Sequence, residues 1–121
     1  MSIARMRAVV LDCPDPGRLA AFYGELLGWR TTTEEDDWVT LTGEQSQRLS
    51  FQKAPDHRPP EWPDPDRPQQ FHLDLTVDDP DEAEAAVLKL GAVKHEHQPS
   101  EDGSFRVYLD PAGHPFCLCV D

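Results

Sequence analysis

Two stretches of the chain follow one pattern, and together they decide the fold. They are LDCPDPGRLAAFYGELLG at Leu11–Gly28 and LTVDDPDEAEAAVLKLG at Leu75–Gly91. Each passes from an apolar segment to an Asp-Pro pair, in which the aspartate can cap a helix and the proline suits its first turn. Apolar residues at helical spacing follow, and a glycine ends the pattern. The copies are offset by 64 residues, which indicates an internal repeat.

The segments around these two predicted helices read as strands. One strand-like segment precedes each helix and three follow it: Met6–Leu11, Trp29–Thr33, Trp38–Thr42 and Leu49–Lys53 in the first half, and Phe71–Val77, Ala92–Glu96, Phe105–Asp110 and Phe116–Val120 in the second. The sequence therefore predicts an α+β fold of two βαβββ units in a single domain, 1–121. A ferredoxin-like sandwich also repeats internally, but it has one strand after each helix.

A proline-rich stretch separates the two halves. Residues 55–68 contain six prolines, which cannot continue a helix or a central strand. We expect a stiff, extended connector there, with unit one at about 1–54 and unit two at about 69–121.

Composition excludes several classes of partner. The 121 residues include 11 basic and 23 acidic side chains, for a net charge of −12. Such a surface repels nucleic acid and anionic membranes, so we expect neither as a partner. No apolar run is long enough for a membrane span or for a signal peptide. Three cysteines cannot all pair within one chain, and reduced thiols in a cytoplasmic protein are expected.

The pattern resembles the vicinal oxygen chelate superfamily, which holds the glyoxalase, bleomycin-resistance and extradiol-dioxygenase proteins, and within it the glyoxalase-like subgroup. The resemblance rests on Asp15-Pro16, Phe22-Tyr23, Leu26–Trp29, Phe71–Leu75 and Asp110–Leu118. It implies curled mixed sheets around a central cavity, with helices outside. It also implies a homodimer, and exposed sheet edges favour the same assembly.

The resemblance further implies four metal positions, on the first and last strand of each unit. They fall at Ala8, Gln52, His72 and Cys117, although Gln52 is placed less securely than the others. Alanine has no ligand atom, and Cys117 stands where a family enzyme has glutamate. We therefore expect no cofactor and regard a divalent metal as disfavoured; if one binds, His72 with Cys117 would hold it.

Strand alternation selects a candidate catalytic pair. His72 and Asp74 share the face of their strand that should line the cavity, and a histidine beside a carboxylate can act as a general base. Same-face neighbours lie about 7 Å apart, so a direct hydrogen bond requires the two side chains to lean together. The alternative is that both are polar lining or a buried salt link.

Other residues are candidates for ligand binding. Cys117 and Cys119 should face the cavity, Arg106 is a candidate clamp for an anionic group and Tyr108 a hydrogen-bond donor. Trp38 and Trp62 are candidate aromatic walls. A solvated arginine, a packed tyrosine and a core Trp38 are the competing interpretations.

Two functions remain open. The first is a protein that binds an unknown small organic molecule in its cavity without the family's metal site. The second is an enzyme of the same superfamily, of lyase, isomerase or dioxygenase type, with His72 as base or residual metal ligand. An interaction module without a small ligand is a third possibility, and analogy of fold does not decide among them.

Overall fold

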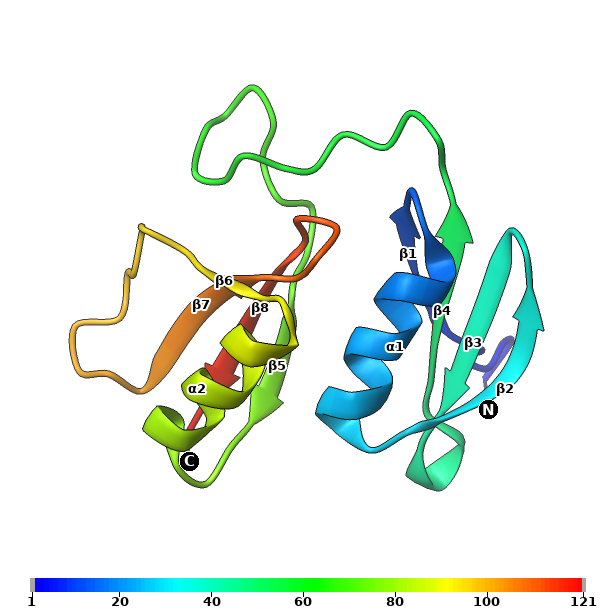
Figure 1. Ribbon diagram of the computed structural model, residues 1–121, viewed down its shortest axis with the longest axis horizontal. Coiled ribbons are helices and arrows are strands. Elements are labelled where there is room, and N and C mark those ends of the chain that lie inside the picture. The colour runs from blue at the N-terminus through cyan, green and yellow to red at the C-terminus, as the bar shows by residue number, and fades with distance from the viewer. Residues whose placement is uncertain (1, 121) are drawn as a thin grey trace. The chain divides into compact units, whose positions relative to one another are not determined.

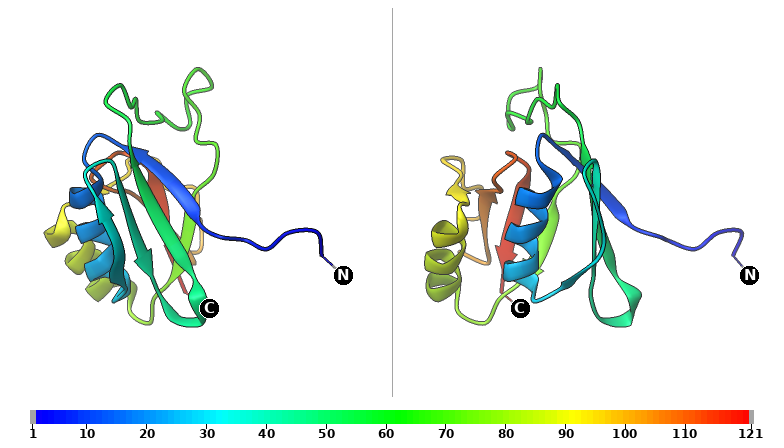
Figure 2. Two further views of the ribbon diagram at one scale, coloured as in Figure 1. Left: turned by 90° about the vertical axis from the view of Figure 1, so that its right-hand side faces the viewer. Right: turned by 45° about the vertical axis from the view of Figure 1, so that its right-hand side comes forward.

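The computed structural model describes residues 2–120 as two compact units, one ending at His57 and one beginning at Arg58 (Figures 1 and 2). The first unit contains β1 (Val9–Cys13), α1 (Pro16–Leu27), β2 (Arg30–Glu35), β3 (Trp38–Thr42), a 3-10 turn (Glu44–Ser46) and β4 (Arg48–Lys53). The second contains β5 (Leu73–Thr76), α2 (Pro80–Leu90), β6 (Val93–Lys94), β7 (Phe105–Leu109) and β8 (Pro115–Cys119).

Both units have the same sheet topology. The strand order is β1-β4-β3-β2 in the first and β5-β8-β7-β6 in the second, with the first strand of each unit parallel to the last and the other pairs antiparallel. This confirms the predicted α+β fold of two βαβββ units and excludes the ferredoxin-like alternative. No helix within residues 2–120 is long and apolar enough to cross a membrane.

The repeated Asp-Pro motifs begin the helices as expected. Asp15 accepts a hydrogen bond from the Arg18 amide, and Asp79 accepts from the amides of the first turn of α2. Gly28 and Gly91 end the helices with positive φ. The local sequence therefore sets both helix starts and ends.

Each helix buries one apolar face against its own sheet. In the first unit, Tyr23 on α1 stacks on Phe51 of β4, with ring centroids 5.8 Å apart. In the second unit, Val87 on α2 is fully buried, and Tyr108 stacks on Phe116 at 5.6 Å. Burial of these large side chains is the main stabilising contribution in each unit.

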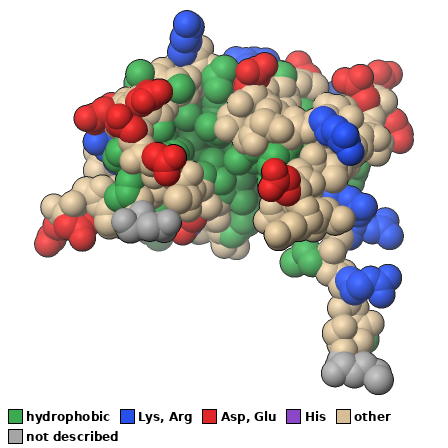
Figure 3. Space-filling view, turned by 90° about the horizontal axis from the view of Figure 1, so that it is seen from below, with side chains coloured by type: hydrophobic (Ala, Val, Ile, Leu, Met, Phe, Trp, Pro, Cys, Tyr) green, Lys and Arg blue, Asp and Glu red, His purple; other side chains and the backbone are tan. Residues whose placement is uncertain are grey.

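Acidic side chains are spread over the molecular face seen in Figure 3 rather than gathered in one patch. The charge of −12 is therefore not concentrated in an acidic site on that face.

Some predicted strand ends are wrong. β1 begins at Val9 rather than Met6, and β5 begins at Leu73 rather than Phe71. β1 pairs only with β4, which begins at Arg48, and Val9 is opposite Leu49, so Met6 and Arg7 extend past the partner strand. The ladder of β5 begins opposite Phe116, next to Pro115, which has no amide hydrogen to donate.

Part of the predicted connector belongs to the second unit. A β-carbon added to Gly113, in the turn between β7 and β8, would lie 2.4 Å from the Pro59 β-carbon. The Glu61 amide also donates to the Arg67 carbonyl at 2.6 Å, and their side chains form an ion pair. The segment from Arg58 onward is therefore folded against the sheet that follows it.

We expect Gly113→Ala to destabilise the protein more than Gly28→Ala. Both glycines have positive φ, at +87° and +69°, which costs an alanine about 1 kcal/mol. Gly28 has open space around it, whereas at Gly113 the methyl group would also overlap Pro59. Urea unfolding of the two variants tests this prediction, and equal losses would show that Pro59 does not pack on the turn.

Candidate functional site

A pocket of about 280 Å³ opens on the sheet of the second unit. β7 contributes Phe105 and Val107, and β8 contributes Cys117 and Cys119. Another side of the pocket is formed by Asp74 on β5 and by Gln69 and His72, which precede that strand. The lining is completed by two loop residues, Trp62 and Pro99. We call this the second-unit pocket.

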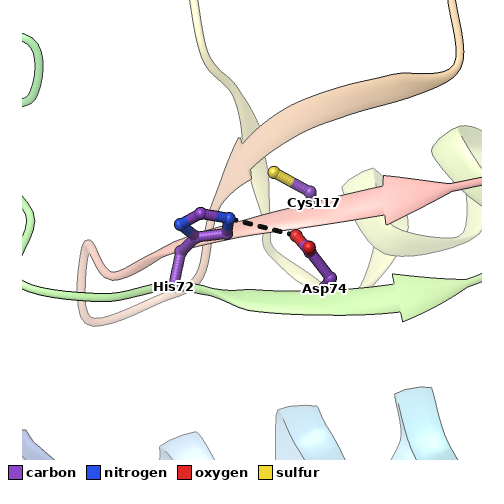
Figure 4. Close-up of side chains that lie close together, drawn as sticks. All are labelled: His72, Asp74 and Cys117. Atoms are coloured by element: carbon purple, nitrogen blue, oxygen red, sulfur yellow. Dashed lines mark ion pairs between the residues drawn. The ribbon is translucent and has the colours of Figure 1, made fainter.

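His72, Asp74 and Cys117 lie together in this pocket (Figure 4). His72 Nε2 lies 3.1 Å from Asp74 Oδ1, and the side chains lean toward each other as a direct contact requires. Asp74 is opposite Cys117 in the parallel ladder. The ligand atoms of the three residues lie within 4.8 Å of one another. The three side chains therefore line one pocket, and their roles in catalysis or binding stay predictions.

The Cys117 thiol is poorly suited to act as a nucleophile. Burial raises its pKa to about 12, and the negative charge of Asp74 and a hydrogen bond to that carboxylate act in the same direction. A thiol with such a pKa stays protonated near neutral pH, and the thiolate is the reactive form. Cys117 therefore contributes a small wall and a weak hydrogen-bond donor.

Trp62 is the connector residue that reaches the second-unit pocket. Its ring centroid lies 5.3 Å from that of His95 and 4.9 Å from that of His97. The His97 amide donates to His95 Nδ1 at 2.9 Å, which fixes the pair of imidazoles. The predicted aromatic wall at Trp62 is therefore present in the lining, supported from behind by two rings.

Arg106 and Tyr108 are not among the residues that line the second-unit pocket, and the structure places both side chains toward α2. Arg106 donates to Asp81 at 2.8 Å, and Tyr108 donates its hydroxyl hydrogen to Glu84 at 2.8 Å, so both side chains bind α2. Tyr108 is opposite Phe116 in the antiparallel ladder, and this pair faces the helix. The alternate residues of β7 line the pocket instead.

The interactions of Tyr108 form a network beneath α2. Lys94 Nζ lies 2.9 Å from Glu84, and Arg106 also approaches that carboxylate. Hydrogen bonds from Lys94 and Tyr108 lower the pKa of Glu84, while burial and the hydrogen bond to Glu84 raise the pKa of Tyr108. The network joins α2 to β6 and β7, behind the wall of the pocket.

We expect Glu84→Gln to lower the free energy of unfolding by about 1–2 kcal/mol at neutral pH, since it removes the charge from these hydrogen bonds. The pKa of Glu84 is lowered from 4.5 in the folded state, so its stabilising contribution is present above pH 4.5 and is lost as pH falls through the folded-state pKa. Urea unfolding at several pH values measures this. Glu82→Gln, at an exposed position of the same helix, should change little; a loss that persists unchanged in acid contradicts the prediction.

The two predicted site residues of the first unit, Trp38 and Gln52, lie on strands β3 and β4 of that unit's sheet. Trp38 Nε1 donates to Thr40 Oγ1 at 3.0 Å, and Gln52 Nε2 donates to Asp12 Oδ1 at 3.3 Å. Their contribution to a ligand site stays a prediction.

The strand register changes the residue assigned to one of the four metal positions that the resemblance implies, the position on the last strand of the first unit. Asp74 pairs with Cys117, and its counterpart Val10, 64 residues earlier, pairs with Ser50. Ser50, and not Gln52, is therefore the ladder counterpart of Cys117.

Four pocket residues were missed from the sequence. Phe105 and Val107 alternate with Arg106 and Tyr108, so the choice of the wrong strand face excluded them. Gln69 and Pro99 lie outside helices and strands, where no periodic pattern signals which residues meet.

Comparison with known proteins decides the family. A family model described as a glyoxalase-like domain matches residues 8–119. The chain belongs to this glyoxalase-like family. It is thus a member of the glyoxalase/bleomycin resistance/dioxygenase, or vicinal oxygen chelate, superfamily. No curated protein matches the chain.

Solved structures share the fold of this glyoxalase-like protein at low sequence identity. A glyoxalase/bleomycin resistance protein/dioxygenase family enzyme from Burkholderia phytofirmans has a TM-score of 0.74 and 17% identity, covering 97% of this chain and 98% of that one. A possible glyoxalase from Bacillus cereus has a TM-score of 0.70 and 11% identity, covering 98% and 99%. A bleomycin-binding protein from Streptomyces verticillus, complexed with copper(II)-bleomycin, has a TM-score of 0.61 and 18% identity, covering 99% of each chain.

The residues of this glyoxalase-like protein do not fit the superfamily's four-residue metal centre. Ala8 offers no ligand atom, and the Ser50 hydroxyl is buried in a hydrogen bond of 2.8 Å with Thr40. The second unit offers His72, Asp74 and Cys117, a different donor set in which the thiol has a raised pKa. A thiol must lose its proton to bind a metal, so this set begins at a disadvantage near neutral pH.

Proposed function

We propose that this glyoxalase-like protein binds a small organic molecule in the second-unit pocket, without the superfamily's four-residue metal centre. The observation that carries the proposal is the convergence in one pocket of an aromatic loop residue, Trp62, with the polar cluster of His72, Asp74 and Cys117. Ligand sites in proteins are concave, mostly apolar and contain a few converging polar groups. A volume of about 280 Å³ suits a molecule of one or two rings.

A second candidate function is enzymatic, and the contact between His72 and Asp74 favours it. A neutral His72 must carry its proton on Nε2 to donate to Asp74, so Nδ1 keeps a lone pair. A carboxylate that orients an imidazole in this way is a common arrangement for a general base. The corresponding reaction is proton transfer of the lyase or isomerase kind. A bound compound that is converted by the protein, and is bound but not converted by His72→Ala, would support catalysis over binding alone.

The binding proposal is tested with a set of single-ring compounds, observed by ligand NMR against the full chain. We expect binders whose affinity falls about 10- to 100-fold in Trp62→Ala, since truncation of an aromatic anchor removes a large contact. Trp62→Phe should keep most of the affinity. If no compound binds, or if Trp62→Ala binds as the parent does, the proposal fails.

The proposed absence of the four-residue metal centre gives a separate prediction. We expect elemental analysis of the untagged protein to find no stoichiometric magnesium, manganese, iron or zinc, because Ala8 and Ser50 leave the family's centre incomplete. His72→Ala is the matched control. About one zinc per chain in the parent protein and none in the variant would overturn this proposal, and would favour metal-assisted chemistry at the cluster.

A further inference from the structure

Two side chains in the lining of the second-unit pocket, Asp74 and Gln69, supply hydrogen-bond acceptors. Asp74 supplies a carboxylate with a 63% exposed side chain, and His72 directs a ring nitrogen to it rather than to open space. Among the described residues, 2–120, no lysine or arginine is part of the lining. Whether His72 is neutral or protonated, its summed charge with Asp74 is negative or zero. The pocket therefore offers no net positive charge to an anion.

Gln69 adds an acceptor that lacks a donor. Gln69 belongs to the lining of the same pocket, and its side-chain oxygen Oε1 is buried without a hydrogen-bond partner among the described residues. Buried polar atoms in folded proteins are paired in the great majority of cases, because leaving one unpaired costs free energy. A ligand with an N–H or O–H group would satisfy this oxygen if the Gln69 side chain turned toward the pocket.

The apolar lining sets the shape of the ligand. The Trp62 ring comes from the connector and is supported by His95 and His97, while Phe105 comes from β7. Rings of this kind provide flat contact surfaces for another ring, and the face of an aromatic ring attracts a cation.

We propose that the second-unit pocket selects flat molecules that carry N–H donors and are neutral or cationic, such as aromatic amides, amines or amidines, over aromatic carboxylates. This inference rests on the proposed binding function and names its ligand class. Asp74 receives a donor or a positive charge, Gln69 receives a second donor, and Trp62 contacts the ring. A carboxylate, which only accepts hydrogen bonds, would face the negative charge of Asp74 and could not pair with Gln69 Oε1.

Three probes of nearly equal size test the proposal. Benzamidinium is a cation, benzamide is neutral and benzoate is an anion, and each has a single benzene ring. Their affinities for the full chain are measured by ligand NMR at neutral pH. We expect benzamidinium to bind at least about 10-fold tighter than benzoate, with benzamide between them, since a charge-assisted hydrogen bond is stronger than a neutral one.

Two variants assign the preference to its residues. Asp74→Asn should bring benzamidinium and benzoate to within about 3-fold of each other. Gln69→Leu should weaken both donor-bearing probes by about 5-fold and leave benzoate unchanged. Asp78→Asn removes the same charge from an exposed position just beyond β5, outside the lining, and should leave the preference intact. Thermal unfolding of each variant checks that it folds.

The outcomes separate this inference from the proposed function. If benzoate binds in the pocket as tightly as benzamidinium, with Trp62→Ala weakening both, the ligand class is wrong and the binding function stands. If Asp78→Asn changes the preference as much as Asp74→Asn does, general surface charge causes it and the inference is overturned. If none of the three probes binds while another single-ring compound does, the ligand class is wrong and the binding function stands; if no single-ring compound binds, both proposals fail.

Discussion

The Phe116→Ala variant is expected to lose about 3–5 kcal/mol of unfolding free energy, the usual cost of removing a buried phenylalanine ring. Phe116 is fully buried on β8, stacks on Tyr108 and is opposite Leu73 in the parallel ladder. Stability of a domain is commonly about 5–15 kcal/mol, so this loss takes a large part of it. Because Cys117 follows Phe116 directly, the pocket should be lost with the packing of the sheet.

Urea unfolding followed by near-ultraviolet circular dichroism measures this loss. Phe71→Ala is the matched control, since Phe71 is 49% exposed and lies before β5. It should cost less than about 1 kcal/mol. Equal losses in the two variants would show that Phe116 is not the packing centre of the second unit.

Filling the second-unit pocket should abolish ligand binding. Cys119 lies at the end of β8, lines the pocket and is partly exposed, so a larger side chain there can occupy the cavity without entering the core. We expect Cys119→Phe to weaken single-ring ligands by at least about 100-fold, because its ring takes the space of theirs. The effect should exceed that of Trp62→Ala, which removes one wall and leaves the space open.

The conservative variant Cys119→Ser provides the control for this experiment. It keeps the side chain small, and its affinity should stay within about 3-fold of the parent protein. Circular dichroism confirms folding of both variants. Full affinity in Cys119→Phe would show that the compounds bind elsewhere on the chain.

The fold was predictable because its signals are local and repeated. Asp15-Pro16 and Asp79-Pro80 cap the helices directly, and Gly28 and Gly91 end them, so neither helix depends on distant contacts for its limits. A repeat offset of 64 residues then implies that the same unit occurs twice.

Part of the site was predictable for a related reason. His72 and Asp74 are two residues apart on a strand-like segment, and alternation places them on one face whatever their partner strand is. Their contact of 3.1 Å depends on how the side chains lean, which alternation does not specify.

Arg106 and Tyr108 show where sequence reasoning stopped. Alternation groups them correctly, since both bind α2, but it does not say which face of β7 meets the helix. That choice depends on the antiparallel register that puts Tyr108 opposite Phe116, and a shift of one residue would reverse it. Gln69 had no comparable signal, because it lies outside helices and strands, where no periodic pattern assigns a side chain to a face.

The measurement that tests the central claim most directly is the mapping of ligand-induced amide shifts on the isotope-labelled full chain, titrated with benzamidinium. The account predicts shifts concentrated at Trp62, Gln69–Asp74, Phe105–Val107 and Cys117–Cys119, the segments that line the second-unit pocket. These shifts should disappear in Cys119→Phe. Shifts confined to residues before Arg58, or no shifts at saturating probe, would contradict a ligand site in the second unit.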